Sequence, residues 1–277
     1  MDYTTNNTSI NNESVEAVRT FYNGYAEREW TRMDRNFFEF EVTKAYISRF
    51  VKPGDRVLDV GGGPGRYSLW LAELGADVTM LELSDENVAM AKKQAALRGL
   101  SLNAIQGDAR FTDTLTEGEF DHVLLMGPLY HLTEESDRVM TVEACLRRLK
   151  KGGCLFTAFI SNYSNLVYML SKQPDMVLDP AEQKWIQTLK DGVSYAGPAF
   201  TDAYFIQPKE IIPFMSRFPL KTRHLFACEG PTAAFQHILS EASDELKAAW
   251  LDLSLALCER EELLSWAEHL MHIGEKI

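Results

Sequence analysis

The stretch 57–70, VLDVGGGPGRYSLW, places an acid, a run of glycines and an amphipathic segment in immediate succession. An apolar run carries Asp59 near its end, and four glycines follow between Gly61 and Gly65. Because glycine has no Cβ atom, such a loop lets a ligand approach the backbone closely. The pattern therefore predicts a strand, a glycine loop that binds a ligand, and a helix.

The glycine spacing disfavours two common phosphate-binding motifs. The dinucleotide fingerprint requires G-x-G-x-x-G, and no register of these glycines satisfies it. A P-loop requires a lysine after its last glycine, and none follows here. The loop instead has the pattern G-x-G-x-G at Gly61, Gly63 and Gly65, preceded by Asp59. A tight turn between strand and helix, without any ligand, is the alternative interpretation.

Three further segments whose residues could bind a ligand or take part in catalysis lie at the ends of apolar runs. Glu82 lies at the end of the run DVTMLEL. The segment QGDA, residues 106–109, lies at the end of the next apolar run, and LLMGPLYHL, residues 124–132, lies at the end of the apolar run after that. The carboxyl ends of parallel strands meet at one edge of a sheet, where ligands of open α/β folds bind. We therefore expect these segments to converge with the glycine loop.

Strand and helix patterns alternate along the middle of the chain. Apolar runs predict strands over 56–60, 77–83, 102–107, 120–126 and 154–160. Amphipathic segments predict helices over 66–75, 85–98 and 134–150, the second with Ser84 as N-cap and Gly99 after its end. This alternation indicates an α/β fold with a doubly wound, mostly parallel sheet.

The flanking regions follow other patterns. Residues 15–33 and 37–50 predict two N-terminal helices, with Ser14 as the first N-cap. Residues 162–206 contain three prolines and several aromatic residues, which predicts an inserted helical and loop element. We expect a strand over 221–230 and two or three helices over 231–277.

Composition narrows the class of protein. Lys and Arg number 28 against 40 Asp and Glu, and the resulting net charge of -12 disfavours a nucleic acid partner. The four cysteines form no CxxC pair, so neither a metal site nor a disulfide framework is indicated. No apolar run reaches the roughly 18 residues of a membrane span, and the polar stretch 1–14 contains no apolar h-region of a signal peptide. We therefore expect a cytoplasmic protein that binds no membrane.

Over about residues 15–160, these motifs resemble the class I S-adenosylmethionine-dependent methyltransferases. The G-x-G-x-G loop after Asp59 is similar to the family's loop beside the methionine and ribose portions of its cofactor. The resemblance implies a Rossmann-like, seven-stranded sheet with N-terminal helices and a helical insertion or cap. It also implies S-adenosyl-L-methionine as the cofactor.

The resemblance assigns roles to individual residues. Glu82 matches the acid that binds the ribose hydroxyls, Leu83 flanks adenine, and Asp108 matches the acid that accepts from the adenine amine. The implied cofactor-binding residues are Tyr25, Asp59, Gly61, Gly63, Gly65, Glu82, Leu83, Gly107, Asp108, Ala109 and Met126.

The segment GPLYHL, residues 127–132, resembles a subgroup of bacterial methyltransferases that act on small molecules. Many DNA and protein amide methyltransferases carry an Asn/Asp-Pro-Pro-aromatic motif here, and this chain departs from it. We hypothesise that His131 or Tyr130 is a catalytic base or orients the acceptor. The alternative is that His131 braces the following helix.

FYNGYAEREW, residues 21–30, resembles the helix that covers the cofactor in that subgroup. Tyr22 and Tyr25 are three positions apart and are predicted to close over the methionine end, with core packing as the alternative. The candidates for the acceptor pocket are Trp30, Arg32, Tyr195, Phe200, Asp202, Tyr204 and Phe205. The alternative interpretation for the candidates in the insertion is that they form the ordinary core of a small cap.

The sequence therefore predicts a methyltransferase acting on nitrogen or oxygen of a small molecule, including secondary metabolites, as a monomer or homodimer. The predicted divisions are a mobile leader (1–13), cofactor-covering helices (14–50), the cofactor-binding core (51–161), an acceptor cap (162–206), and the end of the core with terminal helices (207–277). A peptide or protein acceptor, a non-catalytic cofactor-binding protein, and a nicotinamide-dependent oxidoreductase are the alternatives.

Overall fold

A single sheet of nine strands organises the chain in the computed structural model, which describes residues 12–277. Seven strands follow the order β3-β2-β1-β4-β5-β9-β8, and a hairpin extends the sheet beyond β5. β1 to β5 run parallel, whereas β9 is antiparallel to both β5 and β8. The predicted doubly wound, mostly parallel sheet is confirmed. Most of the predicted leader, residues 1–11, lies outside the described residues.

The strands of the seven-stranded path are β1 (Arg56–Val60), β2 (Asp77–Glu82), β3 (Asn103–Gln106), β4 (Phe120–Leu125), β5 (Leu149–Ser161), β8 (Leu220–Ala227) and β9 (His269–Lys276). Side chains of one strand alternate between the two faces of a sheet. In β1, Val57 packs into one hydrophobic cluster, whereas Leu58 and Val60 pack into another. The sheet is therefore buried on both faces, as its apolar sequence requires.

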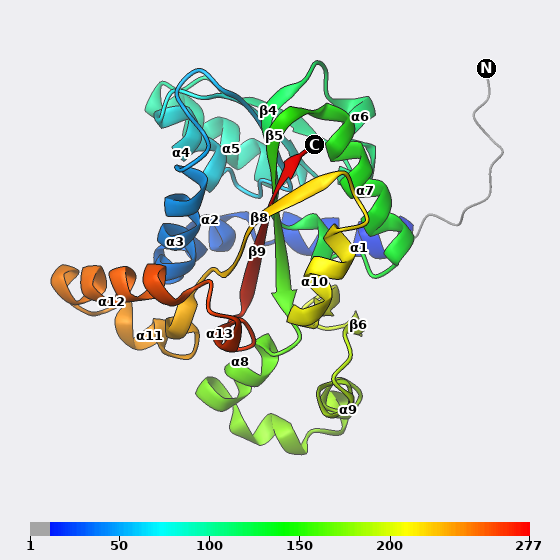
Figure 1. Cartoon of the computed structure of the whole chain (residues 1–277), viewed down its shortest axis with the longest axis vertical. Coiled ribbons are helices and arrows are strands. Elements are labelled where there is room, and N and C mark those ends of the chain that lie inside the picture. The colour runs from blue at the N-terminus through cyan, green and yellow to red at the C-terminus, as the bar shows by residue number, and fades with distance from the viewer. Residues whose placement is uncertain (1–11) are drawn as a thin grey trace.

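Helices cover both faces of the sheet (Figure 1). One side carries α3 (Phe37–Ile47), α4 (Arg66–Glu73), α5 (Asp85–Arg98) and α12 (Asp244–Leu257). The other carries α6 (Thr112–Leu115), α7 (Glu135–Arg148), α10 (Pro208–Met215) and α13 (Glu261–Leu264). Short 3-10 turns connect several elements: η1 (Ala109–Phe111), η2 (Pro128–Tyr130), η3 (Pro174–Leu178), η4 (Pro180–Glu182) and η5 (Gly230–Phe235).

The predicted ends of α5 are confirmed. The Ser84 hydroxyl accepts a hydrogen bond from the Asn87 amide at 3.1 Å, which satisfies one of the free donors of the first turn. Gly99 ends the helix in the left-handed region with φ 66°.

The predicted N-terminal helix over 15–33 is wrong, because the chain forms two helices there. α1 (Asn12–Asn23) ends before Gly24, and α2 (Ala26–Arg35) begins after Tyr25. Hydrogen bonds of the turn, from the Gly24 and Tyr25 amides to carbonyls three residues earlier, replace the helical pattern. The break changes the direction in which Tyr25 points.

The insertion contains a hairpin that the sequence did not predict. It follows α8 (Ser164–Lys172) and α9 (Gln183–Asp191) and consists of β6 (Tyr195–Pro198) and β7 (Asp202–Ile206). β7 joins the end of β5 through the pairs Ile160–Phe205 and Ser161–Ile206. The insertion therefore lies at the carboxyl end of β5, beyond the point of its arrow (Figure 1).

The prediction that the chain ends in helices is only partly right. α11 (Gln236–Leu239), α12 and α13 are present, but residues 269–276 form β9 between β5 and β8. A short apolar run cannot be assigned to strand or helix by periodicity alone. Pairing with β5 and β8 decides the conformation of this run. No helix within residues 12–277 is long and apolar enough to cross a membrane.

We predict that Gly65→Ala destabilises the fold through the contact between α4 and α5. A Cβ atom at Gly65 would lie 2.8 Å from the Ala91 Cβ, and the φ of +91° is unfavourable for alanine. Conformational strain and overpacking together should lower the free energy of unfolding by about 2–4 kcal/mol. Urea denaturation measures the change.

Gly99→Ala is the matched control. Its φ is +66°, but its added Cβ atom would meet nothing within 4 Å, so about 1 kcal/mol of strain is expected. Equal losses in the two variants would contradict the packing argument.

Candidate active site

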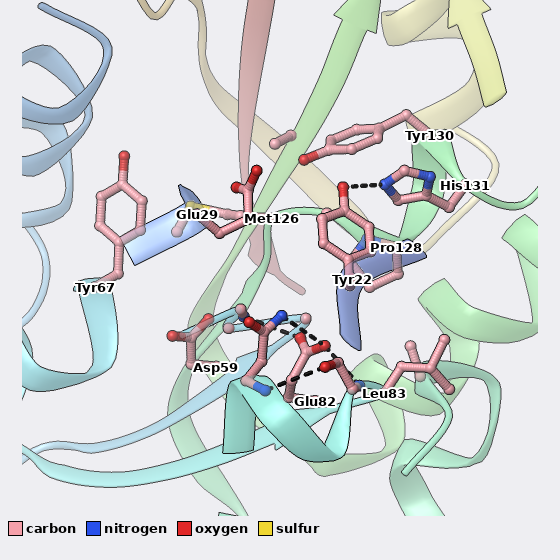
Figure 2. A pocket seen from close by; sticks show the side chains of 18 of the residues that line it. Tyr22, Glu29, Asp59, Tyr67, Glu82, Leu83, Met126, Pro128, Tyr130 and His131 are labelled. Carbon is pink, nitrogen blue, oxygen red and sulfur yellow. Dashed lines mark hydrogen bonds between the residues drawn. The ribbon is translucent and has the colours of Figure 1, made fainter. Parts of the chain in front are cut away.

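The glycine loop lines a cavity at the carboxyl end of the parallel strands. Gly61 and Gly63 have φ values of 75° and 55°, a region that other residues avoid. The Gly61 amide donates to the Leu81 carbonyl at 2.7 Å and so ties the loop to β2. We call this space, of about 160 Å³, the main cavity; Figure 2 shows several of its side chains.

Most of the predicted site residues line the main cavity. They are Asp59, Gly61, Gly63, Glu82, Leu83, Gly107, Asp108, Ala109, Met126, Tyr130 and His131. They come from the carboxyl ends of β1 and β2 and from the loops after β1 to β4, as the parallel topology predicts. Tyr25 and Gly65 are not among the lining residues.

Asp59 presents an unpaired acceptor at this cavity. Its carboxyl is buried, and its Oδ2 accepts a hydrogen bond from the Ser68 hydroxyl at 2.6 Å. Its Oδ1 is buried without a hydrogen-bond partner among the described residues. Burial raises the pKa of Asp59 to about 6, and the nearby Glu82 carboxyl contributes to the increase. A cationic donor that reaches Oδ1 would satisfy this acceptor and favour the ionised acid.

Glu82 is held by the backbone of the loops on either side of it. Its Oε2 accepts from the Gly63 amide at 2.9 Å, and its Oε1 accepts from the Ser84 amide at 2.8 Å. Burial raises the pKa of Glu82, while these hydrogen bonds oppose the increase. Oε1 also accepts from Asn87 Nδ2 at 3.5 Å, whereas Oε2 accepts only from the Gly63 amide among the described residues. Since a carboxylate oxygen has two lone pairs, Oε2 keeps acceptor capacity for a hydroxyl group of a ligand.

The glycines of the loop serve different purposes. A Cβ atom at Gly61 would lie 2.4 Å from Pro128 of η2, whereas one at Gly63 would meet nothing within 4 Å. Gly65, whose predicted contact with the cofactor stays a prediction, allows close packing against Ala91 of α5. Gly63 is therefore the loop position that has open space around its Cα atom and whose amide binds the Glu82 carboxyl in the cavity wall.

Asp108 is fixed by a buried arginine that the sequence did not predict. Its Oδ2 accepts from Arg110 Nη2 at 2.6 Å, and Arg110 Nη1 donates to Asp137 at 2.9 Å. Arg110 is fully buried, so the pair forms in an environment of low dielectric constant. Asp108 thus keeps a defined orientation next to Gly107 and Ala109 in the main cavity.

His131 connects η2 to α1. The Tyr22 hydroxyl and His131 Nε2 lie 2.8 Å apart, and Figure 2 shows this bond across the cavity. Burial lowers the pKa of His131 to about 4, so the ring is neutral at pH 7 and a weak base. The hydrogen bond to Tyr22 attaches His131 to α1 and not to the following helix, and its hypothesised role as a base stays a prediction.

Tyr130 is also a poor base. Burial raises the pKa of its hydroxyl, so the phenol stays protonated at neutral pH. Its ring lies beside His131, with ring centroids 4.9 Å apart. Tyr130 therefore offers a neutral donor at the boundary of the main cavity.

A second cavity, of about 520 Å³, adjoins the first. The two share Tyr22, Glu29, Arg32, Tyr130 and His269 as lining residues. The second cavity lies between α1, α2, the end of β5 and the insertion, so its walls come from elements distant in sequence. Its aromatic lining residues are Phe21, Tyr22, Tyr25, Tyr130, Tyr168, Phe200 and Phe205.

Part of the predicted acceptor pocket lies in this second cavity. Arg32, Phe200 and Phe205 line it, as does Tyr25, which stacks on Phe21 with centroids 4.6 Å apart. The break between α1 and α2 separates Tyr25 from Tyr22 and explains why Tyr25 does not reach the main cavity. Trp30, Tyr195, Asp202 and Tyr204 line neither cavity.

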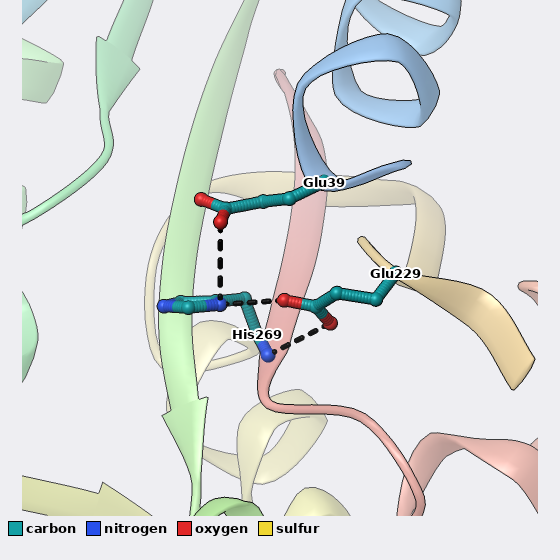
Figure 3. Close-up of side chains that lie close together, drawn as sticks. All are labelled: Glu39, Glu229 and His269. Atoms are coloured by element: carbon teal, nitrogen blue, oxygen red, sulfur yellow. Dashed lines mark hydrogen bonds and ion pairs between the residues drawn. The ribbon is translucent and has the colours of Figure 1, made fainter. Parts of the chain in front are cut away.

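A buried charged cluster of Glu39, Glu229 and His269 lies beside the two cavities, and His269 lines both of them (Figure 3). His269 Nδ1 lies 2.6 Å from Glu229 and 3.8 Å from Glu39, and Arg32 donates to Glu39 at 2.7 Å. Although burial opposes protonation, the two carboxylates raise the pKa of His269 to about 9. Burial opposes ionisation of Glu39, but Arg32 lowers its pKa to about 2.

The spacing of this cluster would also suit a metal ion, since ligand atoms of Glu39, Glu229 and His269 lie within 4.8 Å of one another. Arg32 and the protonated imidazole, however, already balance the two carboxylates. The arrangement is explained by ion pairing among its own side chains. The sequence did not predict it, because Glu39 lies in an apolar helix and His269 in a strand expected to be helical.

Comparisons with known proteins agree with this geometry. Residues 57–153 match a family model described as a methyltransferase domain. The ubiquinone biosynthesis O-methyltransferase of Cronobacter sakazakii is 28% identical over 172 residues, which are 62% of this chain and 64% of that protein. The Shewanella pealeana protein of the same name is 34% identical over 108 residues, 39% of this chain and 44% of that protein. The chain thus aligns with less than two thirds of either relative.

Solved structures share the fold across nearly the whole chain. Magnesium protoporphyrin IX methyltransferase from Synechocystis PCC 6803 has a TM-score of 0.58 at 15% identity and covers 95% of this chain and 100% of its own. The 1,6-didemethyltoxoflavin-N1-methyltransferase of Burkholderia thailandensis also has a TM-score of 0.58, at 13% identity. It covers 98% of this chain and 92% of its own. The chain therefore has the fold of the class I S-adenosylmethionine-dependent methyltransferases, and its residues 57–153 match the methyltransferase domain model.

We predict that Asp59→Asn stabilises the ligand-free protein at neutral pH. The pKa of Asp59 is about 6 in the folded state, above the usual value of 3.8, so the folded state binds this proton more tightly than the unfolded state. Stability is therefore lost as pH rises through the interval between these values. Relative to the native protein, the variant should gain up to about 3 kcal/mol between pH 4 and pH 7.

Urea denaturation of the native protein and the variant across this interval measures the difference. Asp252→Asn, at an exposed position of α12, is the control and should show no such trend. If the free energies of unfolding of the native protein and Asp59→Asn differed by the same amount from about pH 4 to pH 7, burial would not disfavour the ionised Asp59 carboxyl.

Proposed function

We propose that this protein transfers a methyl group from S-adenosyl-L-methionine to an oxygen or nitrogen atom of a small molecule. The observation that carries the proposal is the pair of buried carboxyls, Asp59 and Glu82, held around the glycine loop with acceptor capacity toward the main cavity. The methyltransferase domain match over residues 57–153 supports the same reaction.

The residues present suit the cofactor part by part. The unpaired Asp59 Oδ1 suits its ammonium group, and Glu82 suits the two ribose hydroxyls. Leu83, Asp108 and Ala109 lie together beyond Glu82, where the adenine ring would be held. When bound, the cofactor supplies a methyl carbon activated by its sulfonium.

Binding requires α1 to move outward. The main cavity measures about 160 Å³, below the roughly 300 Å³ of small ligand pockets. α1 closes it with Val15, Val18, Arg19 and Tyr22. The contacts that would open are exposed ones, from Arg19 and Asn23 to Asp85, and two partly buried ones, between Tyr22 and His131 and from Ser84 to Asn23. The exposed ones cost little to break.

The role of the chain is then to align two reactants and exclude water. Tyr22, Arg32, Tyr130 and His269 line both cavities, so they lie where an acceptor would meet the methyl group. Correct alignment alone can contribute roughly 7–11 kcal/mol to catalysis.

The proposed acceptor is a small molecule bound in the second cavity. The cavity volume of about 520 Å³ and the aromatic lining suit such a ligand. The names of the similar proteins refer to ubiquinone biosynthesis and to a didemethyltoxoflavin, which also supports a small acceptor. The net charge of -12 supports the proposal that nucleic acid is not the acceptor.

We further propose that the protein acts in the cytoplasm as a monomer or homodimer. Its four cysteines are free and buried, which suits a reducing compartment. A peptide or protein acceptor and a non-catalytic binding role are outcomes that the following experiment separates.

We predict that isothermal titration calorimetry detects binding of S-adenosylhomocysteine, and that Glu82→Gln weakens it about 10- to 100-fold. The loss corresponds to about 1.5–3 kcal/mol for hydrogen bonds to a charged acceptor. Glu86→Gln, at an exposed position of α5, should bind like the native protein. Absence of heat with native protein would contradict the proposal.

Incubation with methyl-labelled S-adenosylmethionine and fractionated cell extract then identifies the acceptor class. A labelled small molecule is expected. A labelled macromolecule would change the substrate class, and binding without any labelled product would indicate a non-catalytic protein.

A further inference from the structure

Glu268 lies at the edge of the second cavity, directly before β9. The Ser161 amide donates to the Glu268 carbonyl at 2.9 Å, and the next residue, His269, pairs with Ile160. These contacts fix the backbone of Glu268 beside the carboxyl end of β5. Its side chain lines the second cavity next to His269, which lines both cavities.

The Glu268 carboxyl differs from its acidic neighbours because no partner neutralises it. Glu39 is bound by Arg32, and Glu229 by His269. Within residues 12–277, the Glu268 carboxyl has neither a hydrogen bond nor an ion pair, and its oxygens are not among the fully buried polar atoms. Its lone pairs are therefore accessible to a molecule in the second cavity.

The charges around Glu268 make it a proton acceptor near neutral pH. Burial and the Glu229 carboxylate raise the pKa of Glu268 to about 7, although His269 and Arg32 oppose the increase and Glu39 adds to it. The other titratable or charged groups of the second cavity are Tyr22, Tyr25, Arg28, Glu29, Arg35, Tyr130 and Tyr168. A general base is most effective when its pKa is close to the working pH.

Other groups near the cavity boundary are less suited to accept a proton. His131 has a pKa of about 4 and its Nε2 lies in hydrogen-bonding distance of Tyr22. His269 is protonated at neutral pH, and Glu29 is paired with Arg32. Glu268 is thus the carboxyl in the second cavity with a suitable pKa and accessible oxygens.

The walls of the second cavity suit a flat, aromatic molecule. Phe21 and Tyr25 stack on each other, and Phe200 lies 6.1 Å from Phe21 on the side of the insertion. Aromatic side chains favour stacked or edge contacts with another ring. A hydroxyl group on such a ring must lose its proton when it is methylated.

We propose that Glu268 takes the proton from a hydroxyl group of an aromatic acceptor bound in the second cavity. This inference rests on the proposed function. The acceptor oxygen forms a bond to the methyl carbon, the carbon–sulfur bond breaks with its electron pair going to sulfur, and the hydroxyl proton passes to the Glu268 carboxylate. Charge balances, because the positive sulfur becomes neutral while the carboxylate becomes a neutral acid.

Initial rates with catechol and methyl-labelled S-adenosylmethionine test the proposal. Glu268→Gln should lower kcat about 100-fold, the lower range for loss of a general base, with KM for catechol changed less than threefold. The native rate should rise with pH through an acid limb near 7 that the glutamine variant lacks. Glu268→Asp should retain this limb, and the exposed Glu262→Gln should behave like the native protein.

A binding measurement provides a readout independent of turnover. With S-adenosylhomocysteine bound, 4-nitrocatechol should show a larger phenolate absorbance at pH 7 in the native protein than in Glu268→Gln. Unchanged kcat, pH profile and phenolate fraction in the glutamine variant would overturn the role of Glu268.

Two results concern different parts of the account. A native protein that binds S-adenosylhomocysteine but methylates no hydroxylated benzene would overturn the acceptor class proposed for Glu268. A native protein that fails to bind S-adenosylhomocysteine would overturn the proposed function itself.

Discussion

The site depends on the hydrogen bonds that two backbone amides donate to the Glu82 carboxyl. Gly63 and Ser84 donate to its two oxygens from the loops after β1 and at the start of α5. A side chain held from both sides loses little further freedom when a ligand arrives, so the free energy cost of ordering it is already met by folding. Ser84 also caps α5, so the helix and the ligand site are fixed together.

Buried acids are numerous around the two cavities, and the contrast among them is informative. Glu39 and Glu229 are neutralised by Arg32 and His269, which makes that cluster part of the scaffold. Asp59 retains an oxygen without a partner, and the carboxyl of Glu268 has none within the described residues. Since an unpaired buried acceptor is costly, the persistence of Asp59 Oδ1 points to a ligand that completes it, whereas the Glu268 oxygens are accessible to a molecule in the second cavity.

Local sequence signals predicted that the glycine loop, Glu82 and the segment 107–109 lie together at one cavity; their roles toward the cofactor stay a prediction. The glycine loop, Glu82 and the cap at Ser84 each depend on a few consecutive residues and on the parallel order of the strands. The packing of Gly65 against Ala91 shows the limit, because only the approach of α5 reveals this contact.

Features made by distant segments could not be predicted in this way. β9 becomes a strand because β5 and β8 lie on either side of it, and Glu268 and His269 reach the cavities only for that reason. Tyr25 lines the second cavity, and the helix breaks just before it, at Gly24. The presence of a glycine at this position was not enough to predict the break. The Arg110 pairing with Asp108 and Asp137 likewise requires α7 to lie over η1.

The most direct test of the central claim is a crystal structure with S-adenosylhomocysteine bound. The account predicts that both ribose hydroxyls donate to Glu82, that the amino group is bonded to Asp59 Oδ1 directly or through one water, and that α1 lies farther from η2. Electron density for the ligand elsewhere, or at the glycine loop without contact to Glu82, would contradict it.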